Sequence, residues 1–226
     1  CTSLRCYPDI LNYENVCKLA GGEVVYKDKD RRVVDLEKST AFKSPMGCRS
    51  FLHRWINPDS GIEEYEGRNN CGVISVNLVK LALLARGYGQ DHTLNPDIPE
   101  EREKIEEAFN KSLDDVLDVV KEGLLYRVQR LENVKANVSP ILYGNKNNNA
   151  YGALGCSLDP EETIGKMFGK RSSLSLGYVG LWETIIALYG KKIFNNKEMI
   201  DKAKTIMKKL YDTTKKWTLE TDYSFS

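Results

Sequence analysis

Cys48 is the residue whose neighbours most strongly favour chemistry over packing. Gly47 leaves space beside the thiol, and Arg49 places a cation next to it, which is the setting of a reactive cysteine. Residues 41–72 are rich in proline and glycine, so we expect loops there, and loops commonly present reactive groups. These neighbours outweigh the general tendency of a cysteine to be a buried packing residue.

The residues around Cys48 favour radical chemistry over ordinary nucleophilic catalysis. A thiol hydrolase needs a histidine base and an oxyanion hole. His53 follows closely, but no aspartate or asparagine accompanies it in a recognisable motif. A radical role needs no base on the sulfur, because the thiol gives up a hydrogen atom and takes it back.

The charges of the chain nearly cancel, so no overall positive electrostatic field would attract a polyanion. The 226 residues include 33 lysines and arginines against 32 aspartates and glutamates. Such a balance argues against nucleic acid or a membrane surface as a partner. No run approaches the roughly 18 apolar residues of a membrane span, and the N-terminus lacks the layout of a signal peptide. We therefore expect a cytoplasmic protein.

The cysteines are expected to be reduced thiols, since a chain this long without a secretory signal argues against a disulfide framework. The six are Cys1, Cys6, Cys17, Cys48, Cys71 and Cys156. No two of them form a Cys-x-x-Cys pair, and the only histidines are His53 and His92. We predict no metal site, because structural zinc needs about four clustered ligands.

Strand-like and helical segments alternate along the chain, which predicts an α/β fold without separating a barrel from an open sheet. Residues 73–78 read as a buried strand or the entry to a helix. A long amphipathic helix is expected from Asp97, capped by that side chain with Glu100 in a capping box. Residues 172–184 read as a strand running into a helix, and a last helix is expected over about 197–217. Its expected apolar stripe is Ile200, Ala203, Met207, Leu210, Thr214 and Trp217.

Three separated motifs closely resemble the large catalytic subunit of the anaerobic (class III) ribonucleoside-triphosphate reductases. They are Met-Gly-Cys-Arg-Ser-Phe-Leu at 46–52, Gly-Arg-Asn-Asn-Cys-Gly-Val-Ile-Ser-Val-Asn-Leu at 67–78, and Ser-Leu-Gly-Tyr-Val-Gly-Leu at 175–181. The resemblance implies that residues 1–226 form the central catalytic segment of a ten-stranded α/β barrel, with Cys48 on a finger loop inside it.

The resemblance also implies a thiyl-radical mechanism. In that family a glycine near the C-terminus stores a radical, installed by a partner activase that uses an iron–sulfur cluster and S-adenosylmethionine. Cys48 would become a thiyl radical and abstract the ribose 3′ hydrogen of a ribonucleoside triphosphate, and formate would supply the reducing equivalents. No cofactor is expected to bind this segment directly, and the full enzyme is expected to be a homodimer.

An active-site asparagine is a further implication of the resemblance. Asn69 and Asn70 are the candidates, and the family's pattern of asparagine, an apolar residue and glycine favours Asn70. An amide can hydrogen-bond a ribose hydroxyl without adding a charge. A turn-forming role is the alternative for either residue.

The triphosphate is assigned to the segment that opens the helix after residue 180, since backbone N–H groups at a helix N-terminus bind anions. The substrate-binding candidates are Ser175, Gly177, Tyr178 and Gly180. A tight strand-to-helix turn, buried for packing, is the alternative interpretation.

The chain begins at Cys1 and ends at Ser226, so we expect an internal piece of a longer polypeptide, from a split gene, an exon or an intein-flanked extein. The family's N-terminal regulatory part and C-terminal glycyl-radical domain are missing from it, and the piece alone is not expected to turn over substrate. The alternatives are another glycyl-radical enzyme, of the pyruvate formate-lyase type, and a catalytically incomplete nucleotide-binding fragment. The former is disfavoured because Cys48 has no adjacent cysteine.

Overall fold

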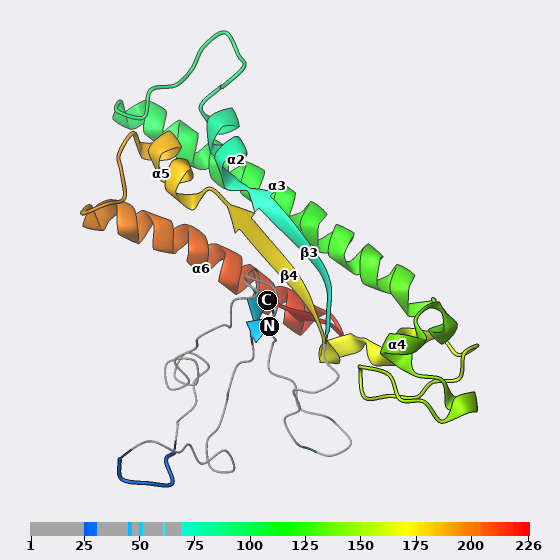
Figure 1. Ribbon diagram of the computed structural model, residues 1–226. Helices are drawn as coiled ribbons and strands as arrows, with labels where there is room; N and C mark the ends of the chain where they lie inside the picture. Colours follow the sequence, from blue (N-terminus) through cyan, green and yellow to red (C-terminus); the bar gives the residue numbers. More distant parts are fainter. Residues whose placement is uncertain (1–24, 31–44, 47–49, 52–60, 62–68) are drawn as a thin grey trace, which may run out of the picture. The chain divides into compact units, whose positions relative to one another are not determined.

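The computed structural model describes residues 25–30, 45–46, 50–51, 61 and 69–226 (Figure 1). The chain divides into two compact units, Cys1–Tyr65 and Glu66–Ser226. In the first unit, β1 (Pro45–Met46) pairs antiparallel with β2 (Ser50–Phe51).

The second unit is built on a three-stranded parallel sheet in the order β3-β4-β5 (Figure 1). The strands are β3 (Asn69–Asn77), β4 (Ser172–Val179) and the short β5 (Ser224–Phe225). Parallel neighbours need crossover connections, and helices supply them here. The expected α/β class is confirmed as a mixed α/β unit around a small parallel sheet.

The segment from residue 73 onward is a strand that turns directly into a helix. β3 ends at Asn77, and α2 (Leu78–Ala85) begins at the next residue. β4 runs in the same way into α5 (Leu181–Tyr189) through Gly180. The prediction of a buried strand or the entry to a helix is confirmed as a strand that enters a helix, but only one face of the strand is buried: Val73 is 51% exposed while Val76 is buried. One face of β3 packs on the core and the other faces outward.

The long helix α3 (Pro99–Glu132) is confirmed, but its predicted cap is not. Ile98 is the residue at the N-cap and makes no side-chain hydrogen bond there, so the capping box of Asp97 and Glu100 does not form. Proline explains the difference, because its fixed φ and missing N–H suit the first helical position. The amphipathic character predicted for this helix is confirmed by one buried stripe: Ile105, Phe109, Leu113, Leu117, Val120, Leu124 and Val128. Val116 and Leu131, which continue the same periodicity, are only partly buried.

The last helix, α6 (Lys197–Glu220), buries a stripe that differs from the prediction in its first half. The buried residues are Met199, Ala203, Ile206, Leu210, Thr214 and Trp217. Ile200 is 36% exposed and Met207 only partly buried, although both were expected in the stripe. Both sets of positions repeat every three or four residues, so the periodicity predicts a helix without fixing which neighbour faces the core.

Short helical segments connect α3 to β4. They are η1 (Ala136–Val138), α4 (Pro140–Tyr143), η2 (Lys146–Asn148), η3 (Ile164–Met167) and η4 (Gly169–Arg171). In the part of the chain that the structure describes, no helix has both the length and the apolar composition needed to cross a membrane.

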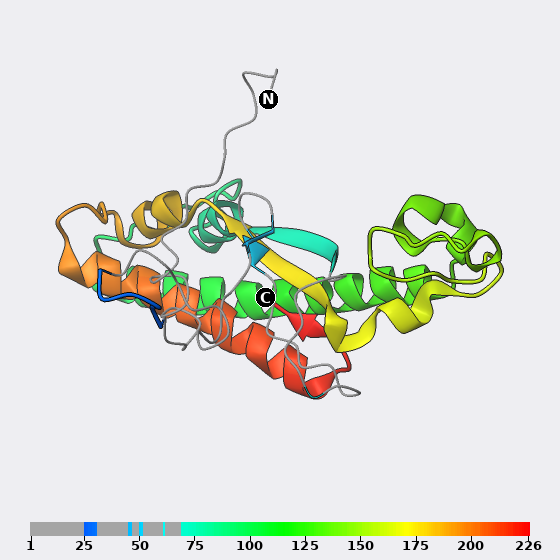
Figure 2. The ribbon, with the colours of Figure 1, turned by 60° about the horizontal axis from the view of Figure 1, so that its bottom comes forward.

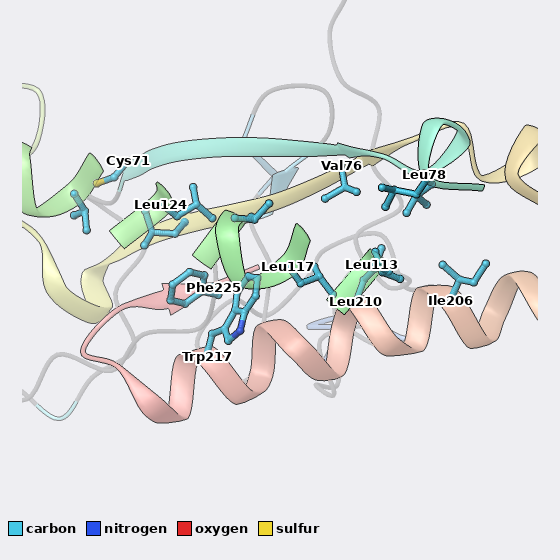
Figure 3. Close-up of a cluster of buried hydrophobic side chains, with 14 of the residues drawn as sticks. Cys71, Val76, Leu78, Leu113, Leu117, Leu124, Ile206, Leu210, Trp217 and Phe225 are labelled. Atoms are coloured by element: carbon cyan, nitrogen blue, oxygen red, sulfur yellow. The ribbon is translucent and has the colours of Figure 1, made fainter. Parts of the chain in front are cut away.

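The main core lies between the sheet and two helices. Figure 2 shows α3 and α6 on the same side of β3 and β4. The side chains that meet there include Val76 and Phe225 from strands, Leu113, Leu117 and Leu124 from α3, and Leu210 and Trp217 from α6 (Figure 3). The Trp217 and Phe225 rings meet edge to face, 5.3 Å between centroids. This packing joins α6 to β5 and fixes the apolar face of the sheet.

Candidate functional site

The two faces of the β3–β4 pair differ in chemistry. Paired residues in parallel strands point to the same side, so Ile74 and Leu176 face the helices together, while Ser75 lies beside Gly177 on the opposite side. We call that opposite side the polar face; its residues are Asn70, Val73, Ser75, Asn77, Ser173, Ser175, Gly177 and Val179. Glycine matters at position 177, because a Cβ there would lie 2.4 Å from the Ser75 hydroxyl oxygen.

A bulge in β3 turns Asn70 onto the polar face. Asn70 pairs with Ser173 and Gly72 pairs with Leu174, which leaves Cys71 without a residue opposite it. Strict alternation would have put Asn70 on the helix side together with Gly72. The extra residue reverses the alternation, and Asn70 thereby joins the serines of β4.

The Asn70 amide is hydrogen-bonded at both ends. Its Oδ1 accepts from the Gly72 backbone N–H at 3.0 Å, and its Nδ2 donates to the Ser175 hydroxyl at 2.5 Å. The Ser175 hydroxyl in turn lies 3.1 Å from that of Ser226. Asn69 has a different environment, because its Oδ1 accepts from the Cys71 thiol, with Sγ 3.2 Å away. The structure therefore distinguishes the two candidate amides.

Cys71, the bulged residue, is a packing thiol at neutral pH. It is only 7% exposed, and burial raises its pKa from 9.0 to about 11. Figure 3 shows it at the start of β3, as one member of the buried cluster. Among the residues that the structure describes, no group of three or more histidine, cysteine or acidic side chains is arranged to hold a metal ion.

Two helix N-termini lie side by side at the carboxyl edge of the sheet. Asn77 caps α2 by accepting from the Lys80 N–H at 3.0 Å, and Gly180 precedes α5 with φ of +79°. Contact between the two helix starts is close, since a Cβ on Gly180 would lie 2.1 Å from a methyl of Val79. Helix N-termini present unpaired N–H groups and the positive end of the dipole, which is favourable for an anion. Glu183, in the first turn of α5, adds a negative charge there.

Besides the two asparagines, the residues predicted from the sequence fall into three groups. Cys48 lies outside the described residues, between β1 and β2. Ser175 is 6% exposed in the body of β4 and lies beside Asn70 rather than at the helix start. The remaining phosphate candidates follow toward the helix: Gly177 in β4, the 41% exposed Tyr178, and Gly180 at the start of α5.

Sequence reasoning missed Ser226 and the bulge. Ser226 continues the ladder beside β4, with its N–H donating to the Leu174 carbonyl at 3.0 Å. Nothing in the tract 221–226 marks a serine as a partner of a strand fifty residues earlier, because that proximity comes from the parallel crossover alone. The bulge leaves no sequence signal beyond the Asn-Asn-Cys-Gly run itself.

Comparison with known proteins places the whole chain in one family. Residues 1–226 match the family model described as anaerobic ribonucleoside-triphosphate reductase. Relatives carrying that name are 39% identical in Haemophilus influenzae, 38% in Escherichia coli and 35% in bacteriophage T4, each aligned over 100% of this chain.

The aligned region is only part of each relative. The chain spans 26% of the length of the two bacterial proteins and 30% of the phage protein. The predicted resemblance is confirmed along the full chain, including all three motifs that carried it. The chain belongs to the anaerobic ribonucleoside-triphosphate reductase family.

Proposed function

We propose that the protein containing this chain reduces ribonucleoside triphosphates to deoxyribonucleoside triphosphates by a thiyl-radical mechanism under anaerobic conditions. The observation that carries the proposal is the polar face: it holds the Asn70 amide and ends at two adjacent helix N-termini. The matched relatives are named for this activity. In our proposal the chain contributes the central segment of a ten-stranded barrel.

Cys48 is the proposed hydrogen-transfer residue, carried by a finger loop between β1 and β2. Its sulfur radical would take the 3′ hydrogen of the ribose, forming S–H and leaving a carbon radical, and would return the hydrogen at the end. A glycyl radical from another part of the protein, installed by an activase with an iron–sulfur cluster and S-adenosylmethionine, supplies the radical. Formate provides the two electrons and leaves as carbon dioxide, while the 2′ oxygen leaves as water.

Asn70 is the proposed active-site amide. Among the residues that the structure describes, its two hydrogen bonds use one lone pair of Oδ1 and one N–H of Nδ2, and they leave one donor and one acceptor position for a ligand. These match a ribose hydroxyl, which both donates and accepts. Asn69 is the less suitable candidate because its oxygen is engaged by the Cys71 thiol.

The triphosphate is proposed to bind at the adjacent starts of α2 and α5, with Gly177 and Gly180 bordering it. Tyr178 pairs with the buried Val76 and therefore lies on the helix side of the sheet, away from this site. The polar face would then hold the ribose, and the phosphates would extend toward the helix N-termini. This order along β4 supports one nucleotide lying over the two strands. Homodimer assembly and a cytoplasmic location belong to the same proposal.

The test compares Asn70→Ala with Asn69→Ala in the full-length, activated protein under anaerobic conditions. Loss of a positioned hydrogen-bonding group from the reacting centre lowers kcat by about 100-fold or more, so Asn70→Ala is expected to show that loss. Asn69→Ala, the matched control next to it, is expected to stay within about threefold of native kcat. Retained activity in Asn70→Ala, with loss in Asn69→Ala, would overturn the assignment.

A further inference from the structure

The orientation of the Asn70 amide is fixed by its surroundings. The Gly72 backbone N–H can only donate, so the atom 3.0 Å from it must be the amide oxygen. The nitrogen then faces the Ser175 hydroxyl, 2.5 Å away on the neighbouring strand. Loss of the second contact would leave the amide held at one end only.

Ser175 is itself oriented by a third residue. Because its oxygen accepts from the Asn70 amide, its own proton can donate to the Ser226 hydroxyl, 3.1 Å away. Backbone bonds hold Ser226 in place, since its N–H donates to Leu174 and its carbonyl accepts from the Leu176 N–H at 2.9 Å. A hydroxyl as deeply buried as that of Ser175 requires such partners.

We propose that Ser175, oriented by Ser226, is a positioning residue that presents the Asn70 amide to the substrate. The inference rests on the proposed role of Asn70 and gives Ser175 a task different from phosphate binding. The Asn70 amide and the hydroxyls of Ser175 and Ser226 form a chain of hydrogen bonds that crosses from β3 over β4 to the end of β5. That chain fixes the amide in advance, so the free donor and acceptor positions point away from Ser175 and Gly72.

The experiment is a double-mutant cycle in the full-length, activated protein. Ser175→Ala is expected to lower kcat by about tenfold with KM within about twofold, because a misdirected group costs turnover. Since Ser175 acts through Asn70, the double variant Ser175→Ala/Asn70→Ala should be no slower than Asn70→Ala alone. Ser224→Ala is the matched control: it removes another buried hydroxyl, which donates to the Lys170 carbonyl at 2.9 Å. Equal losses in Ser175→Ala and Ser224→Ala, or losses that multiply in the double variant, would overturn the inference.

A crystal structure of the Ser175→Ala protein separates this inference from the proposed function. We expect the Asn70 side chain to adopt a second rotamer or a mixture of amide orientations in that variant. An unmoved amide would refute the positioning role even if the Asn70→Ala protein were inactive. If the Asn70→Ala protein were fully active, the proposed function of Asn70 would fail. The crystal structure of Ser175→Ala would still show whether Ser175 orients the Asn70 amide. Should Ser175→Ala fail to fold, Ser226→Ala at its half-buried site tests the same chain of bonds, with a smaller expected loss of about threefold.

Discussion

At the scale of single residues, the bulge at Cys71 decides which asparagine reaches the polar face. Counting back from Val73 with a period of two would place Asn69 on that face and Asn70 on the helix side. The observed register gives the opposite result, and the Asn70–Ser175 hydrogen bond agrees with it. The sequence could therefore predict an amide in this segment, whereas the choice between the two required the register.

Because of Cys71, the free energy of unfolding is expected to fall as the pH becomes alkaline. Its pKa is raised by burial to about 11, so the folded state keeps the proton where the unfolded chain loses it. The stabilisation is fully present below the ordinary thiol pKa and is lost as the pH rises through about 11. Between about pH 8 and pH 10.5, urea unfolding of the full-length protein should show a steeper fall in stability for native protein than for Cys71→Ala.

The difference in the pH dependence of stability between native and Cys71→Ala protein reports the contribution of the Cys71 thiol. Tyr189 also has a pKa raised chiefly by burial, without a contribution from Cys71, so it affects both proteins alike. The pKa of Tyr223 is raised chiefly by burial too, and the Cys71 charge is the smallest of its causes, so this tyrosine differs only slightly between the two proteins. Identical pH dependence in native and Cys71→Ala protein would show that the thiol is not buried as described.

At the scale of elements, the repeated strand-to-helix unit is what brings the site together. β3 runs into α2 and β4 runs into α5, so their parallel pairing places both helix starts at one edge. The strand 172–179 and the helix after it were predictable, because small residues and a glycine separate two apolar periodicities. The side-by-side arrangement was not, since parallel pairing joins residues about a hundred positions apart.

Gly180 is the position where this unit is most sensitive. Its φ of +79° disfavours any residue with a Cβ, and an added methyl would collide with Val79 of the neighbouring helix. Gly180→Ala should lower the free energy of unfolding of the full-length protein by more than the roughly 1–2 kcal/mol that the backbone conformation alone costs. Chemical denaturation monitored by circular dichroism measures the loss.

Gly155→Ala is the matched control for that substitution. Gly155 has a similar φ of +69°, but a Cβ there meets nothing within 4 Å. We expect this variant to lose only the conformational part. Equal losses at the two positions would mean that α2 and α5 do not meet at Gly180.

At the scale of the whole molecule, the chain corresponds to only part of its relatives, so the proposed activity depends on further segments. It spans 26% of the bacterial relatives, and the glycyl radical of our proposal lies outside it. Within the segment, the family was predictable because three motifs occur in the family's order, and the α/β class was predictable because strand-like and helical segments alternate. Which residues of α6 face the core was not predictable, since packing against the sheet decides it. The start of α3 was not predictable either, because a proline at the first helical position sets it.

The most direct test of the central claim measures deoxyribonucleoside triphosphate formation by the full-length, activated protein without oxygen. Native protein and Cys71→Ala are expected to form the product, whereas Cys48→Ala should form none while its glycyl radical remains visible by electron paramagnetic resonance. Product formation by Cys48→Ala at a rate comparable to native protein would contradict the hydrogen-transfer role of Cys48.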